Sequence, residues 1–193
     1  MKIEIRADGT HICGYVNVPE KKSKPVPTVA HGTVIETIDP GVFQRAIDRA
    51  RDILLTVDHG QDIFASTAAG TLTLYEDNIG LYADANVSDS GLIQAAQDGK
   101  IVGWSFGFKA ISDTVEPQND SQYPLRRVTD MNLDHVSLII NKTPIYKATS
   151  WEIMGGCTAK KSGQLMAQNE EYRTRAAAAN NAGFKLRADA LRM

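Results

Sequence analysis

Apolar and polar residues alternate over most of this chain, as they do in strands that bury one face and expose the other. Two pairs of such segments flank short turn-forming sequences, so each pair predicts a β-hairpin. The pairs are residues 1–7 with 11–18 and residues 71–75 with 80–87. Residues 20–27 are charged and contain proline, which predicts a surface loop after the first hairpin.

Two segments change to the spacing of an amphipathic helix. After Asp39 and Pro40, apolar residues recur every three or four positions up to Ala50. We expect this helix to take Asp39 as its N-cap and Pro40 as its first helical residue. Residues 88–90 can cap a second, shorter helix, which Gly99 ends.

The rest of the chain is rich in apolar runs that predict buried strands. These runs are residues 53–57, 101–110 and 126–140, with residues 144–153 offering one more. The polar segment 112–123 predicts a mobile loop between two of them. Many short strands with two interposed helices favour a mainly β fold, either a β-barrel or a curled sheet with helices outside.

A length of 193 residues suits one well-cored domain with an appendage. We place the domain at residues 1–155, because Gly155 and Gly156 are followed by a linker-like segment that contains lysines. Residues 156–193 are then a linker and a C-terminal tail, whose alanine and arginine content predicts partial helix.

Charge and composition exclude several classes of function. The chain has 21 Lys and Arg residues and 23 Asp and Glu residues, which gives a net charge of −2. This charge does not favour binding to nucleic acid or to an anionic membrane. No apolar run approaches the roughly 18 residues that cross a bilayer, and the N-terminus lacks a signal-peptide core. We therefore expect a protein used inside a cell. The two cysteines form no Cys-x-x-Cys pair, so we expect no thiolate zinc site. We also expect no cofactor.

Three polar side chains lie within or at the end of apolar, strand-like runs: Ser105, His59 and His135. A hydroxyl or imidazole that leaves water needs a hydrogen-bond partner, and the simplest partners for these three are one another. A hydroxyl that faces two imidazoles has the composition of a nucleophile with its bases.

Strand parity predicts open space around Ser105. Residues 104, 106 and 108 are aromatic and should enter the core, which leaves Ser105 on the opposite face between Gly103 and Gly107. Its hydroxyl would be unobstructed there, and a substrate strand could lie close to the two glycines. The structural alternative is that strands cross closely at this point and need small residues.

The same alternation puts His59 at the exit of a strand, on the face of Leu55 and Val57. It puts His135 on the face of Leu133 and Ser137. Either histidine could instead make a purely structural hydrogen bond, and that alternative stays open at this point.

Five stretches, in this order along the chain, resemble the prohead (head maturation) proteases of tailed phages and prophages, which are related to the herpesvirus assemblins. They are residues 33–43 (TVIETIDPGVF), 54–60 (LLTVDHG), 70–87, 99–108 (GKIVGWSFGF) and 133–138 (LDHVSL). The resemblance covers residues 10–150. It implies an assemblin-like, closed or nearly closed β-barrel with peripheral helices.

The resemblance further implies a serine endopeptidase in which Ser105 is the nucleophile and His59 the general base. A glutamate usually occupies the third position in the phage family, and this chain has His135 there. Assemblins use a second histidine in that role, so a Ser-His-His triad is implied, with Asp134 or Asp58 as alternative carboxylates. A neutral imidazole stabilises the developing imidazolium less than a carboxylate does, so we expect a slow enzyme.

An oxyanion site and macromolecular substrates are also implied by the resemblance. Arg126 and Arg127 are similar to the assemblin arginine pair that stabilises the tetrahedral oxygen, although adjacent arginines also occur at solvated strand edges. The substrates would be scaffold and major capsid protein precursors, cut inside the assembling procapsid in the cytoplasm of a bacterial host. Residues 175–180 carry the hypothesis of a nearby self-processing site. A homodimer, as in assemblins, stays open.

Two other functions use the same residues. The chain could be a non-catalytic capsid-assembly barrel that binds scaffold and keeps Ser105 and His59 as vestiges, which loss of peptide turnover in Ser105→Ala would exclude. It could also be a metal hydrolase that uses His59, His135 and Asp58, although no His-Glu-x-x-His or similar spacing supports this. Resistance to chelators would exclude the metal hydrolase.

Overall fold

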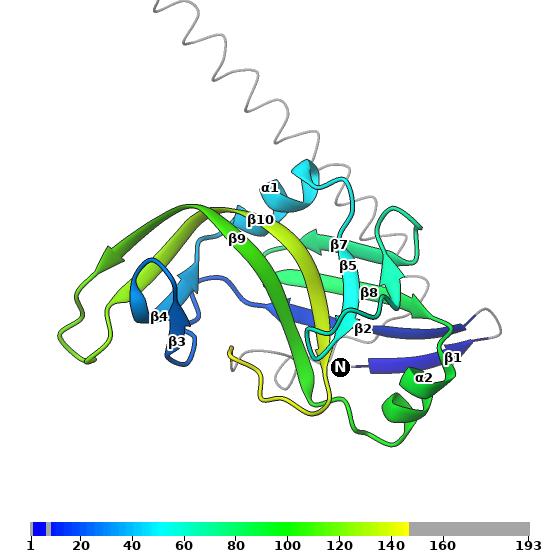
Figure 1. Ribbon diagram of the computed structural model, residues 1–193. Helices are drawn as coiled ribbons and strands as arrows, with labels where there is room; N and C mark the ends of the chain where they lie inside the picture. The colour runs from blue at the N-terminus through cyan, green and yellow to red at the C-terminus, as the bar shows by residue number, and fades with distance from the viewer. Residues whose placement is uncertain (1, 7–8, 147–193) are drawn as a thin grey trace, which may run out of the picture. The chain divides into compact units, whose positions relative to one another are not determined.

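The computed structural model describes residues 2–6 and 9–146. Within them the chain forms ten strands and two short helices, so the predicted mainly β class is confirmed. The strands form two sheets, one in the order β1-β2-β8-β7 and one in the order β3-β4-β10-β5-β6, with β9 paired to β10 (Figure 1). The strand pairing of the described residues shows no closed barrel, and barrel closure stays a prediction.

The four-stranded sheet is built from two hairpins, as the alternation predicted. β1 (Lys2–Arg6) pairs antiparallel with β2 (Gly9–Asn17), and β7 (Leu72–Glu76) pairs antiparallel with β8 (Leu81–Val87). β2 and β8 join the two hairpins. Every second residue of β8 is buried, which gives the sheet one face toward the core.

The second sheet is organised around β10 (Leu125–Ile139). β9 (Gly103–Glu116) runs antiparallel along one edge of β10, and Figure 1 shows the two as long, curved neighbours. β4 (Gly32–Ile38) and β5 (Leu54–Val57) pair in parallel with successive parts of β10. The remaining strands are β3 (Val26–Thr28), paired with β4, and β6 (Ala65–Ser66), paired with β5.

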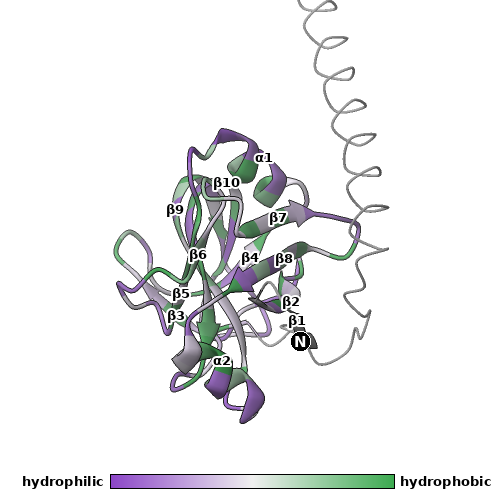
Figure 2. Ribbon diagram, turned by 90° about the vertical axis from the view of Figure 1, so that its right-hand side faces the viewer, coloured by the Kyte–Doolittle hydropathy of each residue, from purple (hydrophilic) through white to green (hydrophobic). Residues whose placement is uncertain are grey.

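The second helix, α2 (Ser90–Gln97), begins and ends as predicted. Asp89 is its N-cap and accepts the backbone N–H of Leu92 at 2.7 Å. Gly99 follows the helix with φ of +67°, a conformation that glycine adopts without strain. Figure 2 shows hydrophilic and apolar residues on both helices, as amphipathic helices require. In the described part of the chain, no helix is long and apolar enough to cross a membrane.

The other helix, α1 (Val42–Arg49), lies where the periodicity predicted it, but its predicted N-cap is wrong. Gly41 is the N-cap, and Asp39 forms an ion pair with Arg127 instead. The carboxylate of Glu76, at the end of β7, accepts the backbone N–H groups of Gly41 and Gln44 at 2.7 and 2.9 Å. A residue 35 positions away in sequence therefore supplies the cap.

Two predicted loops contain strand residues. The segment 20–27 includes the start of β3, and the first five residues of the supposed mobile loop 112–123 belong to β9. β9 continues to Glu116, which lies opposite Leu125, so only residues 117–124 connect β9 to β10. The polar side chains at the end of β9 had indicated a loop, but backbone pairing does not require apolar side chains on both faces of a strand.

Apolar residues of both sheets and of both helices form one core. Trp104 is fully buried in it and Phe106 is 7% exposed, as strand parity predicted. The predicted last strand, residues 144–153, is described only as far as Tyr146, which bridges to Ser23. The predicted tail, residues 156–193, lies outside the described residues, and the division at residue 155 stays a prediction.

Candidate active site

Three neighbouring strands form a surface of small and polar residues. Ser105 of β9 lies opposite Ser137 of β10, which in turn lies beside Thr56 of β5. In the next row of the sheet, Gly107 of β9 lies opposite His135 of β10. Residues that are directly paired in adjacent strands share a face, so these five residues form one surface.

A β-bulge at Asp134 determines which way His135 points. Leu133 lies opposite Phe108 and His135 lies opposite Gly107, so β10 has one more residue than β9 between these pairs. Leu133 therefore points into the core, where it is 3% exposed, and His135 points to the other face. The expected common face of Leu133 and His135 is wrong, because the bulge interrupts the alternation.

A turn after β5 brings His59 to the same surface. Leu55 and Val57 pack into or against the core, and continued alternation would have sent His59 the same way. Asp58 and His59 instead adopt left-handed backbone conformations, with φ of +51° and +56°. The alternation ends at this turn, and the imidazole of His59 reaches the face that carries Thr56. The expected common face of Leu55, Val57 and His59 is therefore wrong.

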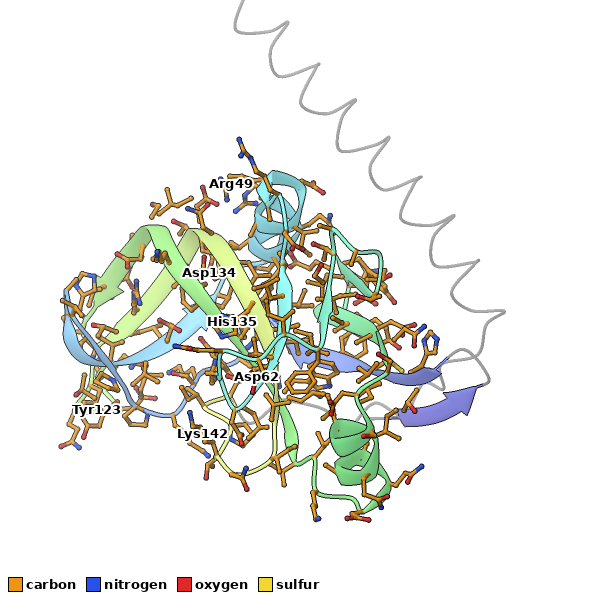
Figure 3. All side chains as sticks on the ribbon, turned by 45° about the vertical axis from the view of Figure 1, so that its right-hand side comes forward. Arg49, Asp62, Tyr123, Asp134, His135 and Lys142 are labelled. Carbon is orange, nitrogen blue, oxygen red and sulfur yellow. The ribbon has the colours of Figure 1, made fainter. Side chains whose placement is uncertain are left out.

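The structure brings Ser105, His59 and His135 together. Ser105 Oγ lies 2.9 Å from His59 Nε2, and His59 Nδ1 lies 2.8 Å from His135 Nε2. The two imidazole rings meet edge to face, with centroids 5.1 Å apart. Ser105 is 6% exposed, so its hydroxyl is shielded from bulk water. Figure 3 labels His135 and Asp134 on β10, and Asp62 and Lys142 on the segments that follow β5 and β10.

This chain of hydrogen bonds fixes the proton positions that a base needs. If His59 Nε2 accepts the proton of Ser105, His59 carries its own proton on Nδ1. That proton is donated to His135 Nε2, which must then be unprotonated. The geometry thus supports a hydroxyl activated by one neutral imidazole whose tautomer is held by a second.

Burial lowers the pKa of both imidazoles. For His59, the nearby His135 and Lys142 lower the pKa further, and Asp58 acts in the opposite direction. For His135, the nearby Asp134 opposes the effect of burial. Both rings are therefore predominantly neutral at pH 7, the state in which His59 can accept a proton.

Asp58 and Asp134 were the alternatives to His135, and neither takes its place here. The carboxylate of Asp58 accepts N–H groups of Ile140 and Asn141, and Asp134 is exposed at the bulge. Across residues 9–146, neither carboxylate hydrogen-bonds to an imidazole ring of the site. His135 is therefore the side chain that contacts the distal nitrogen of His59.

The two candidate oxyanion residues lie far along β10 from this surface. Arg126 precedes Ser137 by 11 positions in the strand, which corresponds to about 35 Å of extended chain. The guanidinium of Arg126 binds Glu36 and Asp113 at 2.8 and 2.6 Å, and Arg127 binds Asp39 at 2.7 Å. The structure brings neither arginine to Ser105, so their positions give the implied oxyanion role no support.

Gly107 is small for a reason that the sequence did not reveal. A Cβ atom at position 107 would lie 2.1 Å from Cε1 of His135, so the imidazole occupies the space beside the glycine. The sequence had suggested that a substrate strand could enter this space, but the imidazole of His135 fills it. Gly103 is buried opposite Ile139, and its predicted contact with substrate stays a prediction.

Sequence reasoning missed Ser137. Its hydroxyl oxygen accepts the backbone N–H of His59 at 2.9 Å. The side chain of Ser137 is fully buried. The available signal was its position two residues after His135, in a strand that is otherwise apolar there. In the described part of the chain, no group of three histidine, cysteine or acidic residues is arranged to hold a metal ion.

Comparison with known families matches residues 1–168 to one described as Caudovirus prohead serine protease. The match includes every residue of the surface formed by β5, β9 and β10. No curated protein matches the chain.

Proposed function

The chain belongs to the Caudovirus prohead serine protease family, and from this premise we propose that Ser105, His59 and His135 are its catalytic triad. Family membership makes the protein a phage prohead serine protease, which acts in the proteolysis of capsid maturation. The observation that supports the triad is the continuous hydrogen-bonded chain of 2.9 and 2.8 Å from Ser105 through His59 to His135.

The proposed reaction has two halves. Ser105 Oγ attacks the carbonyl carbon of the scissile peptide bond while its proton passes to His59 Nε2. When the carbon–nitrogen bond breaks, His59 returns that proton to the leaving amine, and an acyl-enzyme remains. A water molecule then attacks the ester carbonyl of the acyl-enzyme while His59 Nε2 accepts one of the water protons. His59 returns this proton to Ser105 Oγ as the ester bond breaks.

His135 has a distinct role in this mechanism. As the acceptor of the Nδ1 proton, it keeps His59 in the tautomer whose Nε2 faces Ser105. It also stabilises the imidazolium that forms on His59, though less than a carboxylate would. We therefore expect slow turnover, which suffices for a protease that is enclosed with its substrates at high local concentration.

The proposed substrates are the precursors of the scaffold and major capsid proteins, and the site of action is the procapsid interior. Family membership supports a substrate of this kind. Self-cleavage near residues 175–180 is part of the proposal, and these residues lie outside the described structure. Intact-mass measurement of the wild type and of Ser105→Ala after long incubation tests it, and identical masses would contradict self-cleavage.

The direct test of the proposed function is cleavage of a purified scaffold precursor. We expect the wild type to cut it in the presence of a chelator and Ser105→Ala to leave it intact. Ser66→Ala is the matched control, because Ser66 accepts the N–H of Ala69 in a turn outside the site. Binding of the precursor without any cleavage by the wild type would instead support a capsid-assembly protein with a vestigial site.

A further inference from the structure

The turn that carries His59 is held in an unusual conformation. Asp58 and His59 are consecutive non-glycine residues with positive φ. Side chains with a Cβ rarely adopt this conformation, and two in succession need neighbours that hold them there. The turn closes with the N–H of Gly60 donated to the carbonyl oxygen of Val57 at 2.8 Å.

Asp58 fastens this turn to the segment that follows β10. Its Oδ1 accepts the N–H of Ile140 at 2.9 Å, and its Oδ2 accepts the backbone and side-chain N–H groups of Asn141 at 3.0 and 2.9 Å. The ammonium group of Lys142 donates to the carbonyl oxygen of Asp58 at 2.6 Å. Burial opposes ionisation of this carboxyl, but the N–H donors outweigh burial and lower its pKa. Asp58 is thus a charged acceptor for the end of β10.

Ser137 holds the turn from the strand β10, through a hydrogen bond to its backbone. Its side chain is completely buried, and its hydroxyl oxygen accepts the backbone N–H of His59 at 2.9 Å. Ser137 lies opposite Ser105 and follows His135 by two positions on the same face. A single hydroxyl therefore connects the backbone of the proposed base to the strand that carries His135, directly across from the proposed nucleophile.

We propose that Asp58 and Ser137 are positioning residues, which together hold His59 in the one orientation that reaches Ser105 and His135 at once. Neither touches the reacting atoms, and both act through the backbone of His59. The inference rests on the proposed triad. It matters because proton transfer and attack require near-ideal alignment, and a displacement of about 1 Å can cost roughly 100-fold in rate.

The variants remove the two contacts separately. Ser137→Ala removes the acceptor for the His59 N–H, and Asp58→Ala removes the anchor to Ile140 and Asn141. Asp58→Asn keeps one side-chain oxygen and gives a milder change that preserves folding. The matched controls are Ser66→Ala and Asp52→Ala, since Ser66 and Asp52 accept the backbone N–H groups of Ala69 and Ala68 in a turn outside the site.

Kinetics on the scaffold precursor provide the first measurement. We expect kcat to fall about 10- to 100-fold in Ser137→Ala and Asp58→Ala, with KM within about threefold of the wild type. Asp58→Asn should lie between these variants and the wild type, and both controls should retain kcat. A fall in kcat that the controls share would reflect general destabilisation and would overturn the inference.

Proton NMR of the full-length chain provides a measurement that does not depend on activity. The hydrogen-bonded imidazole N–H between His59 and His135 is deshielded and protected from exchange with water, so it gives a downfield signal. The loss of this signal in His135→Ala assigns it. We expect Ser137→Ala and Asp58→Ala to lose this signal and both controls to keep it. If the wild type cleaves nothing and the signal behaves in this way, the proposed function fails and the positioning role stands. If folded Ser137→Ala and Asp58→Asn keep both the signal and kcat, the positioning role is wrong.

Discussion

His59 and His135 support proton transfer only while both rings are neutral. Because burial lowers the pKa of each, activity should persist below the ordinary histidine pKa of about 6.5 and fall only at lower pH. One proton on the pair is enough to block His59 Nε2, so the logarithm of kcat/KM should fall with a slope of one. A pH–rate profile between pH 4 and 8 measures this, and a rate that is flat across the whole interval would contradict the role of His59 as base.

Replacing His135 with glutamate gives a matched comparison. A carboxylate beside His59 stabilises the imidazolium, so His135→Glu should raise the pKa of His59 and move the fall in rate to higher pH. His31 lies near Asp113 and has no contact with the site, so His31→Gln should leave the profile unchanged. Equal profiles for His135→Glu and the wild type would remove His135 from the triad.

The sequence supplied the residue types of this site but not their directions. Ser105, His59 and His135 stood out because each is polar within an apolar run. The faces assigned to both histidines were wrong, since a bulge at Asp134 and a left-handed turn at Asp58 interrupt the alternation. Neither residue is a glycine, so neither interruption has a clear sequence signal.

Where β9 pairs with β10 in the site, the imidazole of His135 requires glycine at position 107. Gly107→Ala would place a Cβ against the His135 ring, so the ring must shift and His59 loses its partner. We expect kcat to fall about 10-fold or more while the strands remain paired. In a His135→Ala background the same substitution should add little, because the clash is gone. Equal losses in both backgrounds, measured as a double-mutant cycle, would show that Gly107 acts through something other than His135.

Strands and helices with short-range signals were predicted well. The two hairpins and α2 follow from alternation, turn residues and a local cap, all within a few positions. The cap of α1 was not predictable in this way, because it comes from Glu76 at the end of β7, far from the helix in sequence. The extension of β9 to Glu116 was missed for a related reason, since its partner strand and not its own composition holds it in place.

A largely buried network of ion pairs joins three neighbouring strands of the larger sheet. Arg126 of β10 binds Glu36 of β4 and Asp113 of β9, and Glu36 also accepts the hydroxyl of Tyr146. Arg126→Ala leaves two carboxylates without their cation, so we expect a loss of about 3–5 kcal/mol in the free energy of unfolding, measured with urea. The exposed pair of Arg127 with Asp39 should matter far less.

The variant Arg127→Ala tests the oxyanion role that the resemblance implied. Loss of an oxyanion donor lowers kcat by about 100- to 1,000-fold. Because neither arginine approaches Ser105, we expect Arg127→Ala to keep kcat within about twofold of the wild type. A loss of the larger size, in protein that remains folded, would return Arg127 to the site.

The arrangement of the whole molecule was the least predictable level. Sequence patterns gave a mainly β chain but no account of how β4 and β5 both pair in parallel with one long strand. Such pairing depends on contacts between residues about 80 to 90 positions apart, which local periodicity does not encode. The parallel pairing of β5 with β10 is nevertheless what places Thr56 beside Ser137, which lies opposite Ser105 on β9.

The most direct test of the proposed triad is the position of a covalent adduct. A reactive organophosphonate should modify the wild-type protein once, and peptide mass spectrometry should locate the adduct on Ser105. His59→Ala should slow this modification sharply, because the hydroxyl loses the base 2.9 Å away. An adduct on a different serine, or precursor cleavage that continues in Ser105→Ala, would contradict the account.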